Sequence, residues 1–165
     1  MNQRFPYIVC LLGAALWCGI IVLPVLAASM QLPFGSAAYK VCSLICHQDD
    51  ARSLHLAGTK LAVCARCTAI YAGFLAGLLL SPWLSKRIRK NTLLWWAIAV
   101  APMLLDVVPG LIGLHTITLD TRLITGGFFG LIAALILTPS ARQGISELMM
   151  RLHLQRGNAY GPKTG

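Results

Sequence analysis

The chain has 165 residues, of which 57% are hydrophobic and only 12% are charged, and its mean hydropathy is +0.72. An ordinary soluble domain carries roughly 25% charged residues, so this composition excludes a soluble globular domain and indicates a membrane protein. The net charge of +9 requires no nucleic acid, because basic residues beside a bilayer bind anionic headgroups. We therefore expect membrane lipids as partners and no nucleic acid.

The first apolar segment, residues 7–29, contains no charged residue. Its apolar run exceeds the roughly 7 to 15 residues of a signal-peptide core, so we expect a retained membrane helix. The only sizeable polar segment follows, at residues 33–63. It predicts one short helix around residues 37–46 and a turn at 48–50.

Three further apolar segments predict membrane helices at about residues 64–83, 92–114 and 123–138. The second and fourth of the expected membrane helices carry small residues at helical spacing, which let helix backbones approach closely. These residues are Ala69, Gly73 and Gly77 in the second helix, and Gly126 and Gly130 in the fourth. A tightly packed bundle is therefore expected.

The C-terminal residues 141–165 form a basic tail beyond the expected four-helix transmembrane domain of residues 1–140. Apolar side chains recur there at helical spacing, which predicts a short amphipathic helix on the membrane surface. They are Ile145, Leu148, Met149 and Leu152. The predicted fold class is thus all-α, an integral membrane bundle of four helices with a Cys/His-rich outer loop.

The distribution of Lys and Arg predicts which end of the bundle faces the cytoplasm. Nine of them lie on the side of the termini and of the KRIRK turn at residues 86–90, and five lie on the side of the Cys/His loop. This bias places both termini in the cytoplasm and residues 33–63 outside the cytoplasmic membrane.

The cysteines carry the most reactive chemistry of the chain. Cys64 and Cys67 lie three apart at the start of the second membrane helix, where the helix N-terminus and Arg66 stabilise thiolates. Upstream, Cys42, Cys46 and His47 form a C-x3-C-H group, and His55 is a further candidate ligand. Thiolate and imidazole ligands suit zinc or iron, whereas two disulfides among the four loop cysteines are the structural alternative.

The segments CHQ (46–48), RS (52–53) and CARCTAIY (64–71) resemble the defining motif of a widespread family of small bacterial and archaeal membrane proteins of unknown function. Ala69 stands where that family usually has glycine. The resemblance extends over about residues 40–135 and implies a prokaryotic cytoplasmic membrane protein. Further matches are Pro102, Asp106, Arg122, Thr125 and Gly126, whereas Val107 replaces a frequent glycine.

The family motif contains three of the four loop cysteines and leaves out Cys42. Because three cysteines cannot form two disulfides, the resemblance implies Cys3His coordination of zinc or iron. The implied ligands are Cys46, His47, Cys64 and Cys67, with His55 or Asp106 as substitutes, since adjacent residues seldom bind one ion.

Two polar residues within the membrane segments are candidates for catalysis. Asp106 is costly near lipid and is expected to face a partner, for which Arg122 is the natural choice. In a hydrolytic site, Asp106 would be the general base for metal-activated water and Arg122 would hold an anionic headgroup.

Two other functions fit the same residues. The layout is similar to that of quinone-linked disulfide-generating enzymes, in which electrons pass from a loop thiol pair to a helix pair and then to quinone. Cys64 and Cys67 would be the helix pair. The last alternative is a non-enzymatic membrane scaffold with loop disulfides.

Overall fold

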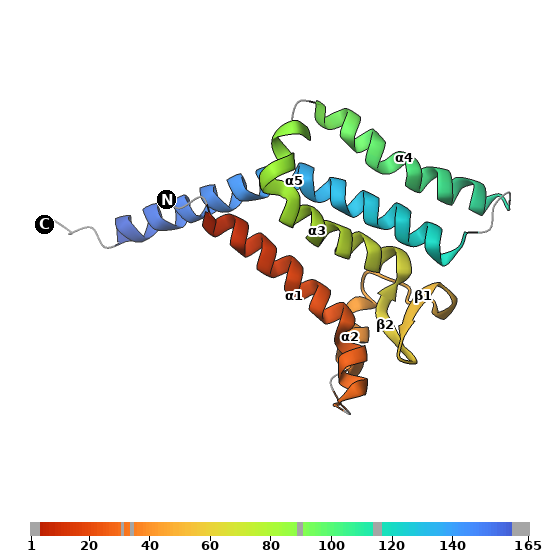
Figure 1. Ribbon diagram of the computed structural model, residues 1–165. Helices are drawn as coiled ribbons and strands as arrows, with labels where there is room; N and C mark the ends of the chain where they lie inside the picture. Colours follow the sequence, from red (N-terminus) through yellow and green to blue (C-terminus); the bar gives the residue numbers. More distant parts are fainter. Residues whose placement is uncertain (1–3, 31, 34, 89–90, 114–116, 160–165) are drawn as a thin grey trace, which may run out of the picture.

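The described part of the chain contains four helices long and apolar enough to cross a membrane, as the computed structural model in Figure 1 shows. The structure describes residues 4–30, 32–33, 35–88, 91–113 and 117–159, except for the side chains of residues 4, 86–87 and 152–159. The candidate spans are Phe5–Ser29, Ala65–Ser85, Thr92–Leu111 and Leu119–Arg151. The predicted all-α membrane bundle is confirmed.

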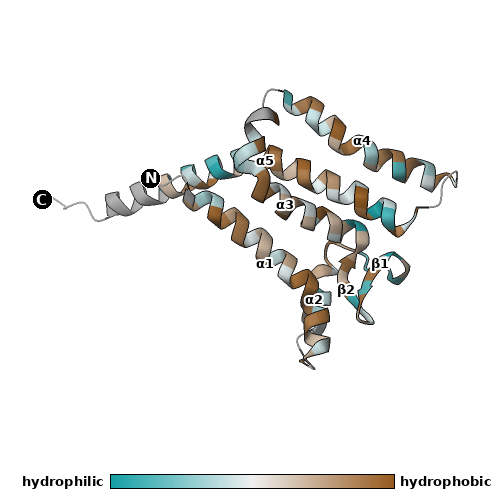
Figure 2. Ribbon diagram, viewed as in Figure 1, coloured by the Kyte–Doolittle hydropathy of each residue, from teal (hydrophilic) through white to brown (hydrophobic). Residues whose placement is uncertain are grey.

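The elements follow one another in a simple order. They are α1 (Arg4–Ser29), α2 (Gly35–Cys42), the 3-10 helix η1 (Asp50–Arg52), β1 (Ser53–Leu56), β2 (Thr59–Cys64), α3 (Ala65–Ile88), α4 (Thr92–Leu111) and α5 (Leu119–Ala159). Hydrophobic residues dominate α1, α4 and the span of α5, and more hydrophilic residues surround β2 and the start of α5 (Figure 2). This pattern is typical of a bundle surrounded by lipid.

The most extensive helix packing joins α3 to α5, and small residues make it possible. A Cβ atom built on Gly73 would lie 2.2 Å from the Gly127 carbonyl oxygen, and one on Gly130 would lie 2.0 Å from that of Ile70. Only residues without a side chain fit at such distances. The tight packing that these small residues predicted is therefore found between these two helices.

The sequence did not predict the antiparallel hairpin of β1 and β2. Its register pairs Ser53 with Cys64 and Leu56 with Thr59, and the turn is formed by Ala57 and Gly58. Both turn residues have positive φ, 50° and 76°, as a two-residue hairpin turn requires. The hairpin ends where α3 begins, so β2 continues directly into the membrane helix.

α5 is longer than the sequence predicted. We expected a break after residue 138 and a separate amphipathic helix, but one helix of 41 residues runs from Leu119 through Pro139 to Ala159. Leu148 is exposed and Ile145 is half-buried, whereas the Leu152 side chain is outside the described part. At 1.5 Å per residue, α5 is about 61 Å long, roughly twice the thickness of the hydrocarbon core.

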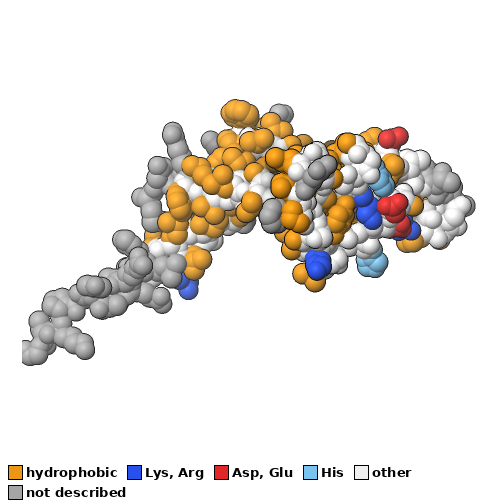
Figure 3. Space-filling view, turned by 90° about the horizontal axis from the view of Figure 1, so that it is seen from below, with side chains coloured by type: hydrophobic (Ala, Val, Ile, Leu, Met, Phe, Trp, Pro, Cys, Tyr) orange, Lys and Arg blue, Asp and Glu red, His pale blue; other side chains and the backbone are white. Residues whose placement is uncertain are grey.

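The two ends of the bundle differ in character. α2, the hairpin, the end of α4 and the beginning of α5 lie at one end, opposite the beginning of α1 and the far end of α5 (Figure 1). We call the former the hairpin end. Charged and histidine side chains gather there, while hydrophobic side chains cover the middle of the molecule in the view of Figure 3.

Candidate metal centre

The segment between α2 and η1 is held in place by the side chain of Gln48. Its amide Nε2 donates to the Tyr39 carbonyl at 2.7 Å and to the Ala62 carbonyl at 2.8 Å, which ties α2 to β2. Lys60 donates from Nζ to the Gln48 carbonyl at 3.0 Å, and the Tyr39 hydroxyl donates to the Lys60 carbonyl. Gln48 itself has φ 52°, a left-handed conformation that these bonds stabilise.

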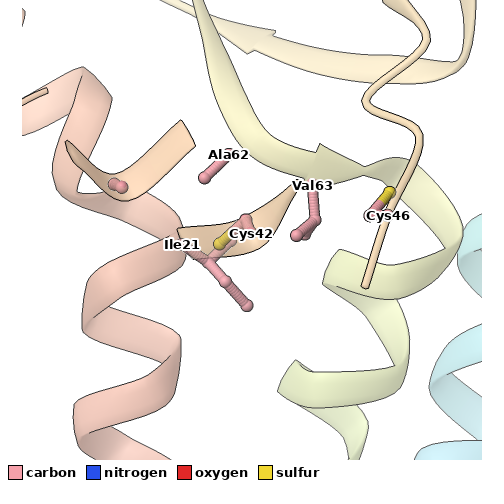
Figure 4. Packing of buried hydrophobic residues seen from close by; sticks show 6 residues of the cluster. Ile21, Cys42, Cys46, Ala62 and Val63 are labelled. Carbon is pink, nitrogen blue, oxygen red and sulfur yellow. The ribbon is translucent and has the colours of Figure 1, made fainter. Parts of the chain in front are cut away.

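A small hydrophobic core lies beneath these hydrogen bonds. Ile21 of α1, Cys42 of α2, and Ala62 and Val63 of β2 are almost completely buried together (Figure 4). Cys46 joins the same cluster and is 7% exposed. This packing brings the backbone of residue 46 against the end of β2, where the Cys64 N–H donates to the Cys46 Sγ atom at 3.3 Å.

Three cysteine sulfurs converge at this point. The Sγ atoms of Cys46, Cys64 and Cys67 all lie within 4.8 Å of one another. They come from the segment after α2, the last residue of β2 and the first turn of α3. We call this group the thiol triad.

The spacing of the thiol triad is suitable for a metal ion. With Zn–S bonds of about 2.3 Å, tetrahedral geometry places two sulfur ligands about 3.8 Å apart. Sulfurs within 4.8 Å of one another therefore need to approach by no more than about 1 Å. All six cysteines of the chain, including those of the triad, are unbonded thiols in the structure.

The pKa of Cys64 is lowered from an ordinary value of 9.0 to about 5. The largest cause is a hydrogen bond from the Cys67 thiol, and backbone N–H groups of Cys67 and Arg66 and the Cys46 thiol add to it, against the effect of burial. Cys42 behaves differently, because burial and then the nearby Cys46 raise its pKa. The thiolate form that a metal requires is therefore favoured at Cys64, the last residue of β2.

The histidines expected as ligands lie outside the thiol triad. Among the described His, Cys, Asp and Glu residues, the group whose ligand atoms converge contains the three cysteines alone. His47 is exposed, whereas Cys46 next to it is buried, so the two neighbouring side chains do not face the same site. His55 lies 3.3 Å from Asp50 on the hairpin surface.

Arg66 provides the ion pair that we expected from Arg122. Its Nη2 atom lies 2.5 Å from Oδ2 of Asp106, and the two side chains are only 15% and 5% exposed. Arg122 is half-buried within electrostatic range of Arg66, Asp106 and Cys64. Arg66 is thus an ion-pair partner of Asp106 that the sequence did not indicate, and Arg122 lies near the same carboxylate at the hairpin end of the bundle.

The glycine contact between α3 and α5 places Arg66. A Cβ atom on Gly126 would lie 2.7 Å from the Arg66 carbonyl oxygen and 3.4 Å from its Cγ atom. Thr68 fixes the start of the same helix, because its hydroxyl donates to the Cys64 carbonyl at 3.1 Å. Arg66 therefore connects the first turn of α3, which carries Cys67, to Asp106 of α4.

The fold and the thiol triad define a class: a four-helix membrane protein whose polar hairpin end carries a cluster of three thiols. The family model described as predicted membrane protein (DUF2085) matches residues 46–136, more than half of the chain. The chain belongs to this family.

The chain is also similar to the uncharacterized protein MJ1492 of the archaeon Methanocaldococcus jannaschii. The two are 41% identical over 106 residues, which cover 61% of this chain and 66% of the relative, just under two thirds of its length. No solved structure matches.

Proposed function

We propose that the thiol triad binds one zinc or iron ion and that this ion holds the polar hairpin end of the protein to the membrane bundle. The convergence of the Cys46, Cys64 and Cys67 sulfurs within 4.8 Å carries the proposal. Cys46 is separated from Cys64 by eighteen residues, so a shared ion would fasten the loop to α3. Soft thiolate ligands select zinc and iron over magnesium or calcium.

The fourth coordination position distinguishes a structural from a hydrolytic site. His47 follows Cys46 and would close a Cys3His site after a local rotation, whereas water in that position would leave the site open for catalysis. In the hydrolytic case Asp106 is the general base and Arg122 holds an anionic group. The ion pair of Asp106 with Arg66 favours the structural site, because the carboxylate is already held by the guanidinium.

Elemental analysis of the full chain, purified in detergent without oxygen, tests the proposal. We expect about one zinc or iron per chain, and loss of the metal in C46S, C64S and C67S. Cys42→Ala is the matched control, because Cys42 is buried in the same core but lies outside the triad. Metal in C42A but not in the triad variants supports the site.

A metal-free wild type with intact triad thiols overturns the metal site. A metal-free wild type with a reducible disulfide between Cys64 and Cys67 also overturns it, and favours thiol-disulfide exchange linked to quinone. Retention of the metal in His47→Ala would leave water in the fourth position and support the open site. Its loss in this variant would support Cys3His coordination.

We also propose that both termini face the cytoplasm and that the hairpin lies outside the cytoplasmic membrane. The excess of Lys and Arg near the termini and the α3–α4 turn supports this orientation. Cysteines introduced one at a time at Ala57, in the hairpin turn, and at Gly144, about 38 Å along α5 from its first residue, test it. A membrane-impermeant maleimide added to whole cells should label the Ala57 variant above the level of the wild-type chain, whose own thiols set the background, and the Gly144 variant no more than that level. The reverse result would invert the topology.

A further inference from the structure

An apolar pocket of about 450 Å³ lies between α1, α3 and α5, within the part of the molecule that spans the membrane. Its volume falls in the range of small-molecule sites, roughly 300 to 1,000 Å³. The residues that line it include Gly13, Trp17, Tyr71, Phe74, Leu78 and Thr138. None of the three cysteines of the thiol triad lines this pocket, so a ligand could occupy it whether or not the triad holds a metal.

One end of the pocket is polar. The Trp17 and Tyr71 rings meet edge to face at 5.8 Å, and the Tyr71 phenol lies beside the indole. The buried Trp17 indole has the Tyr71 phenol as its hydrogen-bonding neighbour. With its oxygen placed against the indole N–H, the Tyr71 hydroxyl can donate its own proton to an acceptor on a ligand.

The depth of this polar end limits the kind of ligand. The span of α3 from Ala65 to Ser85 has 21 residues, which at 1.5 Å per residue matches the hydrocarbon thickness of about 30 Å. Tyr71 follows Ala65 by six residues and therefore lies about 9 Å inside the hydrocarbon region. Phospholipid carbonyls stay at the interface, whereas the ring of a lipid-soluble quinone carries its carbonyl groups into the hydrocarbon.

The pocket is also next to the thiol triad. Cys67 precedes Tyr71 by four residues, so the two side chains lie on the same face of α3 one turn apart. The Tyr71 phenol is within electrostatic range of both Cys67 and Cys46. A ring bound at Trp17 and Tyr71 would thus lie beside the thiols and whatever ion they hold.

We propose that this pocket binds a membrane quinone, with a ring carbonyl accepting from the Tyr71 hydroxyl and the apolar chain lying along Phe74 and Leu78.

Quenching of Trp17 fluorescence by a decyl-substituted benzoquinone tests the proposal with the full chain in phospholipid nanodiscs. The Trp17→Phe variant gives the signal of the other three tryptophans, which is subtracted. We expect saturable quenching in the wild type and binding about three- to tenfold weaker in Tyr71→Phe, the loss of one hydrogen bond.

Two glycine variants of α1 provide a matched pair. A Cβ atom at Gly13 or at Gly19 has no neighbour within 4 Å, so a leucine fits at either position. Gly13 lines the pocket and Gly19 does not. Gly13→Leu should therefore fill the pocket and weaken binding at least about tenfold, while Gly19→Leu should bind as the wild type does.

Equal quenching of the wild type and Gly13→Leu, or quenching that rises linearly without saturation, overturns the proposal. So does a spin-labelled phospholipid that quenches Trp17 in the wild type but not in Gly13→Leu, since lipid would then occupy the pocket. The metal content of every sample is measured alongside. Loss of quinone binding with metal retained, or the converse, shows which of the two proposals fails.

Discussion

Adding one methyl group at Gly130 should separate the two most closely packed helices. A Cβ atom there would lie 2.0 Å from the Ile70 carbonyl oxygen, 2.8 Å from its carbon and 3.0 Å from its Cα. All three are backbone atoms, which cannot rotate away as a side chain can. To reach an ordinary contact of 3.4 Å, α5 must move from α3 by about 1.4 Å. Overpacking costs about 1–3 kcal/mol, and this position should reach the upper value.

Equilibrium unfolding in mixed micelles, followed by far-UV circular dichroism, measures this cost. Gly144→Ala is the control, because Gly144 lies in the same helix with no atom within 4 Å of an added Cβ. It should lose no stability and gain up to about 1 kcal/mol from helix propensity. If Gly130→Ala unfolds at the same denaturant concentration as Gly144→Ala, the close contact between α3 and α5 does not exist. Gly73→Ala places its Cβ against the Gly127 carbonyl oxygen of α5 and should lose stability in the same way.

Three further outcomes are expected at the hairpin end. Asp106→Asn should destabilise the protein by about 3 kcal/mol in the same unfolding assay, because it removes the negative charge that faces the buried Arg66 guanidinium. The control Asp50→Asn changes a side chain that is 76% exposed, so its stability should stay within about 0.5 kcal/mol of the wild type. Gln48→Ala should speed hydrogen exchange of the β2 amides about tenfold or more, because two buried carbonyl acceptors lose their donor, and unchanged exchange would show that Gln48 does not hold the loop. In the metal-free protein, the rate at which iodoacetamide modifies Cys64 should be constant above pH 6 and fall to half near pH 5, because the pKa of Cys64 is about 5. A rate that reaches half its maximum only near pH 9 would contradict this. The Cys64 thiolate is more stable in the folded chain than in the unfolded chain, where the pKa of the thiol is 9.0. Its ionisation therefore contributes fully to the stability of the fold above pH 9.0, and this contribution is lost as the pH falls through about 5.

The spans could be predicted from the sequence because lipid imposes a simple rule of length and apolar composition. The small-residue faces of α3 and α5 were also predictable, since small residues four apart on a membrane helix are typical of a face that packs against another helix. That these two faces meet each other could be known only from the structure. The ion pair of Asp106 with Arg66 could not be predicted. Hydropathy gives the depth of Arg66 and Arg122 in the membrane but not the rotation of their helices, and both arginines lie at the same depth.

The hairpin and the position of His47 escaped prediction for local reasons. β1 and β2 have four and six residues, and Ala57-Gly58 is a weaker turn signal than Asn-Gly or Asp-Gly. Gly58 was still a usable signal in the sequence, because glycine readily takes the positive φ that this turn needs. The backbone of residues 46–48 is irregular and includes a positive φ at Gln48, so the sequence could not show that Cys46 is buried while His47 is exposed.

The glycine contact between α3 and α5 also sets an order for biogenesis. α3 leaves the ribosome well before α5, with α4 between them, so its glycine face must wait in the bilayer for the last helix of the chain. During that interval the Arg66 carbonyl has no Gly126 against it, although α1, α2 and the hairpin are already complete. Maturation of the hairpin end therefore ends only after synthesis of the last span, and a chain truncated before α5 should be a substrate for membrane quality control.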